Sequence, residues 1–450
     1  MKKIKIIALS FVVCLAACDS SSDDNDNDES VQFEGVIEWS KTIGGGNGDT
    51  AYSIVNTFDG NVAVLGFTSS TDGDINNKSL NVNDYWLMKI DPEGNLLWNK
   101  TYGGTDDDRG QKLVQTQDGG FAMAGFSKSS DGDASNNEGF HDNWLVKTDN
   151  SGNFIWEKSY GFAGNDHAYA LVETQDNGFF MAGSLDAISS GGLGNTSKSS
   201  NNSKAVLHAG GEYWCHKLDA QGNVEWQRFF GGTSDDRAFG TIQANDGGYI
   251  VTGLSESNDL DITNNRGNYD YWVIKLNSTG DILWEKSFGG TGIDQSRSVV
   301  KTEDNGYIIA GNSFSEDIDV EGNYGSSDFW LVKIDDNGNT VWKKNYGGFD
   351  FDLATNIKKS RDGYVVSGYS QSSNNDLKEN YGDNDFWVIK INERGDLLWE
   401  KNFGGSALDL AYDVVESPAG DIYVVGETES TDFDILENKG GKDLLIVKIK

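Results

Sequence analysis

Apolar and polar residues alternate along short segments of this chain, and the pattern returns about every 58 residues. In one copy the alternation predicts four strands, over residues 223–230, 237–244, 249–255 and 271–277. Turn signals rich in Asp and Gly separate these segments. Because no copy carries a long amphipathic helical pattern, the chain is predicted to be all-β, which excludes a helical solenoid.

Tryptophans mark the repeat. Seven of the thirteen lie 57 to 70 residues apart: Trp39, Trp98, Trp156, Trp226, Trp284, Trp342 and Trp399. The other six each lie twelve residues before a member of that series: Trp86, Trp144, Trp214, Trp272, Trp330 and Trp387. Seven copies of a four-stranded unit predict a seven-bladed β-propeller over residues 33–450. We expect the tryptophans to be apolar plates packed between blades.

The two ends of the repeat are out of phase. The first copy begins at its tryptophan strand, residues 36–43, and the last copy ends at its fourth-type strand, residues 444–449. The last blade therefore lacks an outer strand, and the N-terminal segment supplies a spare one. We predict that these two segments pair and close the ring, which removes both open sheet edges.

The repeats resemble those of bacterial seven-bladed propeller lipoproteins, which combine a GG…D start with a G-x-S-x-S middle. Gly231-Gly232, Asp236 and Gly253-Leu254-Ser255 carry the likeness in one copy. The turns from Asp91 to Trp98 and from Asp335 to Trp342 are similar to the tryptophan-docking turns of quinoprotein propellers, with one residue fewer between Asp and Gly. The resemblance implies the propeller fold and names no ligand.

Residues 1–17 are predicted to be a lipoprotein signal peptide, with three lysines before a short apolar stretch. Leu15-Ala16-Ala17-Cys18 resembles a lipobox, so we expect cleavage before Cys18 and a lipid on its sulfur. Residues 18–32 then form an acidic tether that we expect to be disordered. These features predict an outer-membrane lipoprotein of the cell envelope, exposed at the surface and attached through its lipid. Asp19 beside the lipid instead suggests retention at the inner membrane, which is the alternative.

The formal net charge of -35 excludes nucleic acid as a natural partner, because such a surface repels phosphate. It suits cations, basic partners or solubility. Of the three cysteines, Cys14 leaves with the signal, Cys18 is acylated and Cys215 remains alone, so no disulfide is expected.

Three polar positions recur in every copy. An aspartate follows the glycine pair: Asp49, Asp108, Asp166, Asp236, Asp294, Asp352 and Asp409. An acid precedes the fourth-type strand: Asp84, Asp142, Glu212, Asp270, Asp328, Asp385 and Asp443. A lysine lies within that strand: Lys89, Lys147, Lys217, Lys275, Lys333, Lys390 and Lys448. We expect structural roles, as loop caps or ion pairs between blades, and a carboxylate ring around the channel is the alternative.

The loops between the second and third strands of each copy are long and acidic, and strand alternation places them on the same face as the GG…D loops. Five carry Asp-x-Asp: Asp72 and Asp74, Asp131 and Asp133, Asp259 and Asp261, Asp317 and Asp319, Asp432 and Asp434. Such motifs are typical of solvated turns, and they also offer hard oxygens to calcium, although none completes an EF-hand pattern. Loops on a rigid scaffold are common binding sites, so this acidic loop face is the expected site.

One copy, between Trp156 and Trp226, is twelve residues longer than its neighbours. It holds His167, His208, Cys215 and His216 and a Ser/Gly/Asn run over residues 189–204. These residues allow a metal or nucleophile site, but adjacent Cys215 and His216 in one strand point to opposite sides. A flexible insertion above core substitutions is the alternative interpretation.

Three functions fit the sequence. The first is a non-catalytic, monomeric binding or scaffold propeller that holds a glycan, peptide or protein on its acidic loop face. The second is an enzyme, either a polysaccharide glycosidase or lyase that uses paired carboxylates, or a quinoprotein dehydrogenase. The third is an assembly platform in the envelope. Because no acid specific to one blade stands out as a catalytic partner, we expect the first function and no enzyme.

Overall fold

The structure is a computed structural model that describes residues 35–195, 208 and 210–450. The predicted signal peptide, Cys18 and the tether lie outside the described residues. Over the described ranges every regular element is a β-strand, and no helix is long and apolar enough to cross a membrane.

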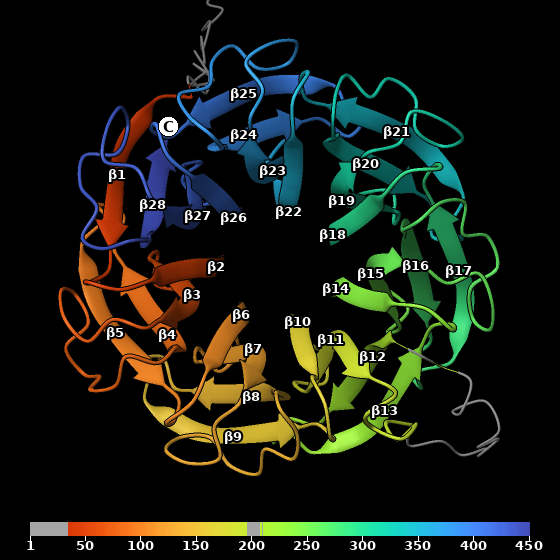
Figure 1. Cartoon of the computed structure of the whole chain (residues 1–450), viewed down its shortest axis with the longest axis horizontal. Helices are drawn as coiled ribbons and strands as arrows, with labels where there is room; N and C mark the ends of the chain where they lie inside the picture. The colour runs from red at the N-terminus through yellow and green to blue at the C-terminus, as the bar shows by residue number, and fades with distance from the viewer. Residues whose placement is uncertain (1–34, 196–207, 209) are drawn as a thin grey trace, which may run out of the picture. The chain divides into compact units, whose positions relative to one another are not determined.

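Seven antiparallel sheets of four strands each stand around a central axis, as Figure 1 shows. The innermost strands are β2 (Asp49–Asn56), β6 (Asp108–Gln115), β10 (His167–Glu173), β14 (Asp236–Gln243), β18 (Asp294–Lys301), β22 (Asp352–Ser360) and β26 (Asp409–Glu416). The second strands are β3 (Val62–Thr68), β7 (Phe121–Ser127), β11 (Phe179–Asp186), β15 (Tyr249–Ser255), β19 (Tyr307–Ser313), β23 (Gly363–Ser370) and β27 (Ile422–Thr428).

The third and outermost strands complete each blade. The third strands are β4 (Asp84–Ile90), β8 (Asp142–Thr148), β12 (Gly211–Leu218), β16 (Asp270–Leu276), β20 (Asp328–Ile334), β24 (Asp385–Ile391) and β28 (Asp443–Ile449). The outer strands are β1 (Ile37–Ile43), β5 (Leu96–Tyr102), β9 (Phe154–Tyr160), β13 (Val224–Phe230), β17 (Ile282–Phe288), β21 (Thr340–Tyr346) and β25 (Leu397–Phe403). We number the blades 1 to 7 from the blade that begins with β2.

The predicted ring closure is confirmed. Blade 7 has the strand order β1-β28-β27-β26, so the N-terminal strand is the outer strand of the C-terminal blade. The pairing runs from Ile37 opposite Ile449 to Ile43 opposite Leu444, and the Val36 amide donates to the Lys450 carbonyl at 2.9 Å. Both ends of the repeat are thereby hydrogen-bonded, and no sheet edge is left at the junction.

The hydrophobic core lies between neighbouring blades. The six tryptophans of the third strands are almost fully buried, and each belongs to a cluster that joins two blades. The outer-strand tryptophans reach across the junction as well, since the indole Nε1 of Trp226 donates to the Ser278 carbonyl at 3.0 Å in blade 4. The tryptophans are therefore interblade plates, as their spacing predicts.

The two faces of the propeller, at opposite ends of its central axis, carry different connections. The turns that join first to second strands and third to outer strands are short, and Gly94, at φ +78°, takes the left-handed conformation that such a turn requires. The opposite face carries the GG…D loops and the long loops between second and third strands. The innermost strands begin at this loop face and run toward the short turns. The position of a residue within its innermost strand therefore sets its depth along the channel.

Candidate functional site

The aspartates that follow the glycine pairs cap the loops of the loop face. Asp236 is fully buried, and its Oδ2 accepts hydrogen bonds from the Gly232 amide at 2.7 Å and from Ser257 Oγ at 2.9 Å. The same amide contact recurs in each of the seven blades. These carboxylates are structural caps and do not form a ring around the channel.

The acids that begin the third strands lie close to these caps. Asp270 Oδ2 accepts the Arg266 amide at 2.8 Å, and its other oxygen is buried against Gly289, beside Asp294. Burial raises the pKa of Asp270 to about 7, and the Asp294 carboxylate contributes in the same direction. Equivalent acids, Asp328 and Asp385, also have pKa values raised to about 7 by burial. Each blade junction therefore holds a close pair of buried acids.

The seven recurring lysines form ion pairs at the opposite end of the blades. Lys147 Nζ lies 2.9 Å from Asp118 in the short turn of its own blade, and every copy has an equivalent pair. Lys275 also lies 2.6 Å from Asp336 in the next blade. The recurring lysines thus stabilise turns within blades, and some connect neighbouring blades as well.

The Asp-x-Asp motifs hold the long loops against the GG…D loops. Asp131 Oδ1 accepts the Thr105 amide at 2.8 Å, and Asp259 Oδ1 accepts the Thr233 amide at 2.9 Å. The central residue of each copy has a positive φ, including Ile318 at 58°. No three His, Cys, Asp or Glu side chains within the described ranges are grouped so as to hold a metal. Calcium binding by these loops stays a prediction.

The structure separates the candidate residues of the irregular blade. His167 is on the innermost strand, whereas Cys215 and His216 are on the third strand. Cys215 is buried in the cluster toward blade 4, and His216 packs against Trp214 and Tyr160. Burial lowers the pKa of His216 to about 3 and raises that of the Cys215 thiol. His208 packs on Phe229 and pairs with Glu212. These four residues do not form one site.

A different set of side chains meets in the central channel, where a cavity of about 930 Å³ follows the innermost strands. Each innermost strand has a β-bulge at the third residue after its cap position, and a bulge of this kind re-aims a side chain. The seven bulge residues all line the cavity: Tyr52, Gln111, Tyr169, Phe239, Arg297, Thr355 and Tyr412. The channel is therefore walled by side chains that differ from blade to blade.

The charge of the cavity is opposite to that of the chain. Among the described residues that line it, Lys112, Arg237, Arg297 and Lys358 are cationic and none is acidic. Arg237 pairs with Asp235 at 2.9 Å, but Arg297 donates to the neutral Gln295 Oε1 at 2.9 Å and lies 4.5 Å from the Phe239 ring. No carboxylate within the described ranges forms an ion pair with Arg297, so its positive charge faces the cavity uncompensated.

A buried acid lies behind the two lysines. Asp413, on β26, is fully buried and accepts hydrogen bonds from Ser53 Oγ and the Ile54 amide, both at 3.0 Å, and from Asn356 Nδ2 at 2.7 Å. Lys112 and Lys358 lie 3.8 and 3.6 Å from its carboxylate, which is too far for good hydrogen bonds. We call Asp413, Lys112 and Lys358 the Asp413 cluster.

The Asp413 cluster carries one more positive than negative charge. Burial lowers the pKa of Lys112 to about 8, and the nearby Lys358 acts in the same direction while Asp413 opposes both effects. The two ammonium groups therefore share one internal counter-ion and keep donors for a further anion.

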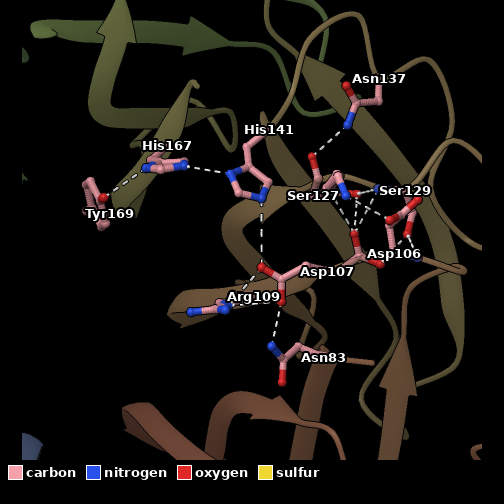
Figure 2. Close-up of polar contacts among 12 residues, drawn as sticks. Asn83, Asp106, Asp107, Arg109, Ser127, Ser129, Asn137, His141, His167 and Tyr169 are labelled. Atoms are coloured by element: carbon pink, nitrogen blue, oxygen red, sulfur yellow. Dashed lines mark hydrogen bonds and ion pairs between the residues drawn. The ribbon is translucent and has the colours of Figure 1, made fainter. Parts of the chain in front are cut away.

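Figure 2 shows a second polar feature, a hydrogen-bonded chain between blades 2 and 3 that ends at Tyr169, which lines the cavity. Tyr169 Oη lies 3.1 Å from His167 Nδ1, and His167 Nε2 lies 3.1 Å from His141 Nδ1. His141 Nε2 is 3.8 Å from Asp107, which also pairs with Arg109 at 3.0 Å. Burial lowers the pKa of His167 to about 4, so a neutral imidazole holds the Tyr169 hydroxyl.

The sequence interpretation missed the Asp413 cluster. It looked for an acid specific to one blade and found none convincing, yet Asp413 is such an acid. At its position the other innermost strands have Ser53, Lys112, Ala170, Gly240, Ser298 and Asn356. Comparison of the seven copies at this position would have shown an acid in one copy where no other copy has one, which is the available sequence signal.

The chain matches no protein-family model and no curated protein sequence. Among solved structures, it is similar to the Pan2 WD40 domain of Neurospora crassa, with 10% identity, a TM-score of 0.47 and 89% of each chain covered. Sqt1 from Chaetomium thermophilum is 11% identical with a TM-score of 0.44, covering 93% of this chain and 99% of that chain. Drosophila Plexin A, in complex with Semaphorin 1b, is 8% identical with a TM-score of 0.46, covering 92% and 87%. At these identities the likeness concerns the fold alone.

Proposed function

We propose that this protein is a non-catalytic binding propeller that takes an anionic ligand into its central channel. One observation carries the proposal: four cationic and no acidic side chains, among those described, line a cavity in a chain with 71 acidic and 36 basic residues. The low-dielectric walls of a cavity focus the electric field of such charges. The cavity volume of about 930 Å³ is in the range of small-molecule sites. The binding site proposed here is the channel, in place of the acidic loop face.

The other expected features fit this role as parts of the same proposal. A lipid on Cys18 would attach the propeller to the cell envelope, at the outer membrane, and the acidic tether would separate it from the bilayer. The acidic exterior would repel anions everywhere except at the channel, and this contrast favours binding at a single place. Binding without catalysis needs only the preorganised cations and aromatic rings described above.

A fluorescence titration with an anilinonaphthalene sulfonate, a small aromatic anion, tests the proposal on the purified full chain. We expect saturable binding with one site per chain, weakened at least ~10-fold by Arg297→Gln, which corresponds to about 1.4 kcal/mol. Arg394→Gln is the matched control, because Arg394 is highly exposed on a short turn away from the channel. Its affinity should equal that of the unmodified protein.

Three results would overturn the proposal. They are absence of saturable binding, equal affinities for Arg297→Gln and the unmodified chain, and equal losses for Arg297→Gln and Arg394→Gln. Unchanged melting temperatures in both variants ensure that a lost affinity reflects the channel and not unfolding.

A further inference from the structure

Five large apolar or aromatic side chains lie on the loop face of blades 5, 6 and 7, which are consecutive in the ring (Figure 1). Ile318, Phe349 and Phe433 are 56%, 63% and 60% exposed, Tyr324 is 48% exposed, and Tyr381 is half-buried. None of the five lines the channel cavity. We call these five residues the apolar arc.

The loops that carry the apolar arc contact one another across the blade junctions. Tyr381, in the long loop of blade 6, stacks on Phe433 of blade 7 with ring centroids 5.1 Å apart. In blade 5 the loop at Tyr324 packs against the Phe349 backbone, where its next residue, a glycine, leaves no room for a Cβ. The Phe349 amide donates to Asn374 Oδ1 at 2.9 Å, in the loop that also carries Tyr381. The loops are therefore in contact from blade 5 to blade 7.

Other blades have small or charged residues at the same positions. Phe349 follows a glycine pair, and three other blades have threonine there: Thr105, Thr233 and Thr291. Tyr324 and Tyr381 precede the acid of the third strand by four residues, and three other blades have charged residues there: Glu138, Arg266 and Lys439. Because the same loops form without large apolar side chains, the fold does not require the apolar arc.

Ile318 and Phe433 also have an unfavourable backbone conformation. Each is the central residue of an Asp-x-Asp turn, with φ of 58° and 51°. Blades 1 and 2 have Gly73 and Gly132 at this position, and glycine adopts a positive φ without strain. A positive φ is rare for a β-branched or bulky residue. Because both side chains are more than half exposed, burial within this chain offsets little of the strain, which points to a contact with another molecule.

The surroundings of the apolar arc indicate the charge of that molecule. Exposed carboxylates lie beside its rings in blades 6 and 7: Asp350, Glu379, Asp383 and Asp432. Within the described ranges, none of these four pairs with a lysine or arginine. Phe140, exposed on blade 2, has the Lys128 ammonium 5.1 Å from its ring, whereas among the described residues no cation lies over Phe349 or Phe433. Carboxylates and aromatic faces both bind ammonium and guanidinium groups, so this surface favours a cationic partner.

We propose that the apolar arc is a docking surface for a basic and apolar segment of another protein. The apolar side chains of the partner contact the arc, and its lysines and arginines bind the flanking carboxylates and the ring faces. A second copy of this chain does not fit, because two faces of a protein with a net charge of -35 repel each other. An anionic membrane is repelled for the same reason. This surface is separate from the channel and does not depend on the function proposed for it.

Isothermal titration of the full chain with a short synthetic peptide of alternating leucine and lysine tests this inference. Peptides of alternating leucine and glutamate, and of alternating serine and lysine, are the comparison ligands. We expect the leucine–lysine peptide to bind at least ~10-fold more tightly than either comparison peptide.

The variants use residues that other blades already have. Ile318→Gly/Phe349→Thr/Phe433→Gly should weaken the leucine–lysine peptide at least ~10-fold without lowering the melting temperature, because glycine relieves the strain of both turns. Tyr324→Lys, which places a cation on the arc, is a second variant and should weaken the peptide at least ~3-fold. Phe140→Thr is the matched control, an exposed aromatic residue of the loop face outside the arc, and should leave the affinity unchanged.

Four results would overturn the inference. Equal binding of the serine–lysine peptide would mean that charge alone acts, and equal binding of the leucine–glutamate peptide would mean that charge plays no part. Unchanged affinity in the triple variant would also overturn it, and Tyr324→Lys decides in the same way if the triple variant does not fold. Binding of phosphatidylcholine vesicles that the triple variant loses, with no binding of the leucine–lysine peptide, would make the arc a membrane-contact surface instead.

Discussion

The substitution Asp413→Asn probes the charge balance at the centre of the channel. It keeps the shape of the side chain, removes the negative charge and turns one acceptor oxygen into a donor. The carboxylate accepts bonds from Ser53 and the Ile54 amide at one oxygen, and from Asn356 and the Val414 amide at the other. Asn356 cannot simply turn its amide around, because its Oδ1 already accepts Ser298 Oγ at 2.7 Å.

The expected loss of stability follows from these contacts. Hydrogen bonds to a charged group contribute about 1.5–3 kcal/mol each, and removal of one partner from a buried charge cluster typically costs about 3–5 kcal/mol. For a domain spanning residues 35–450, an unfolding entropy of about 0.9 kcal/mol/K converts a loss of ~4 kcal/mol into a fall of ~5 °C in melting temperature.

The same substitution, which lowers stability, should raise the affinity of the channel for an anion. Without Asp413, the ammonium groups of Lys112 and Lys358 have no internal counter-ion, so an anionic ligand should bind at least ~3-fold more tightly. Scanning calorimetry and sulfonate titration of the same sample measure both quantities. Glu93→Gln, which neutralises an exposed acid on a short turn, is the control and should change neither.

Two results would refute this reasoning. A fall in melting temperature below ~1 °C would show that Asp413 does not hold the blades together, since the estimate above requires several times that change. A weaker affinity for the anion would show that the two lysines do not serve the ligand. In the Lys112→Met/Lys358→Met background, Asp413→Asn should cost less than in the unmodified chain, because the substitution then removes a buried carboxylate that has already lost both ammonium partners.

Three further predictions follow from the titration and loop chemistry. First, acids such as Asp270 have pKa values raised to about 7. The folded state therefore binds more protons than the unfolded state between pH ~4 and ~7. The stability that these protons contribute is lost as the pH rises through ~7. Urea denaturation should give a more stable protein at pH 5.5 than at pH 8, and Asp270→Asn should reduce that difference; equal stabilities would contradict the prediction. Second, because the pKa of Lys112 is lowered to about 8, anion affinity should fall between pH 7 and 9, and Lys112→Met should remove this decline in titrations followed by fluorescence. Third, if the Asp-x-Asp loops bind calcium, millimolar calcium should raise the melting temperature and a chelator should reverse the rise. An unchanged melting temperature would refute calcium binding there.

Most of the fold could be predicted from the sequence because the information is local and repeated. Alternation set the strand over residues 249–255, which is β15 as observed, and the out-of-phase ends predicted the pairing of β1 with β28. The tryptophan spacing placed interblade contacts such as Trp226 to Ser278. Each of these depends on a pattern that seven copies repeat, so a weak signal in one copy is reinforced by the others.

The candidate site could not be predicted in the same way. Asp413, Lys112 and Lys358 come from blades 7, 2 and 6, and only the closed ring brings these blades to one axis. The side chains that line the channel depend on the bulges in the innermost strands, which shift the register by one residue without a clear mark in the sequence. The acidic loops were the predicted site because they are conspicuous in the sequence. The cations of the channel are not conspicuous, because they are few in a sequence that holds 71 acidic residues.

The location of a bound anion tests the central claim most directly. A crystal structure of the full chain with the anilinonaphthalene sulfonate would show it. The account predicts ligand density inside the channel, with the sulfonate group on Arg297. Density on the acidic loop face, with none in the channel, would contradict it.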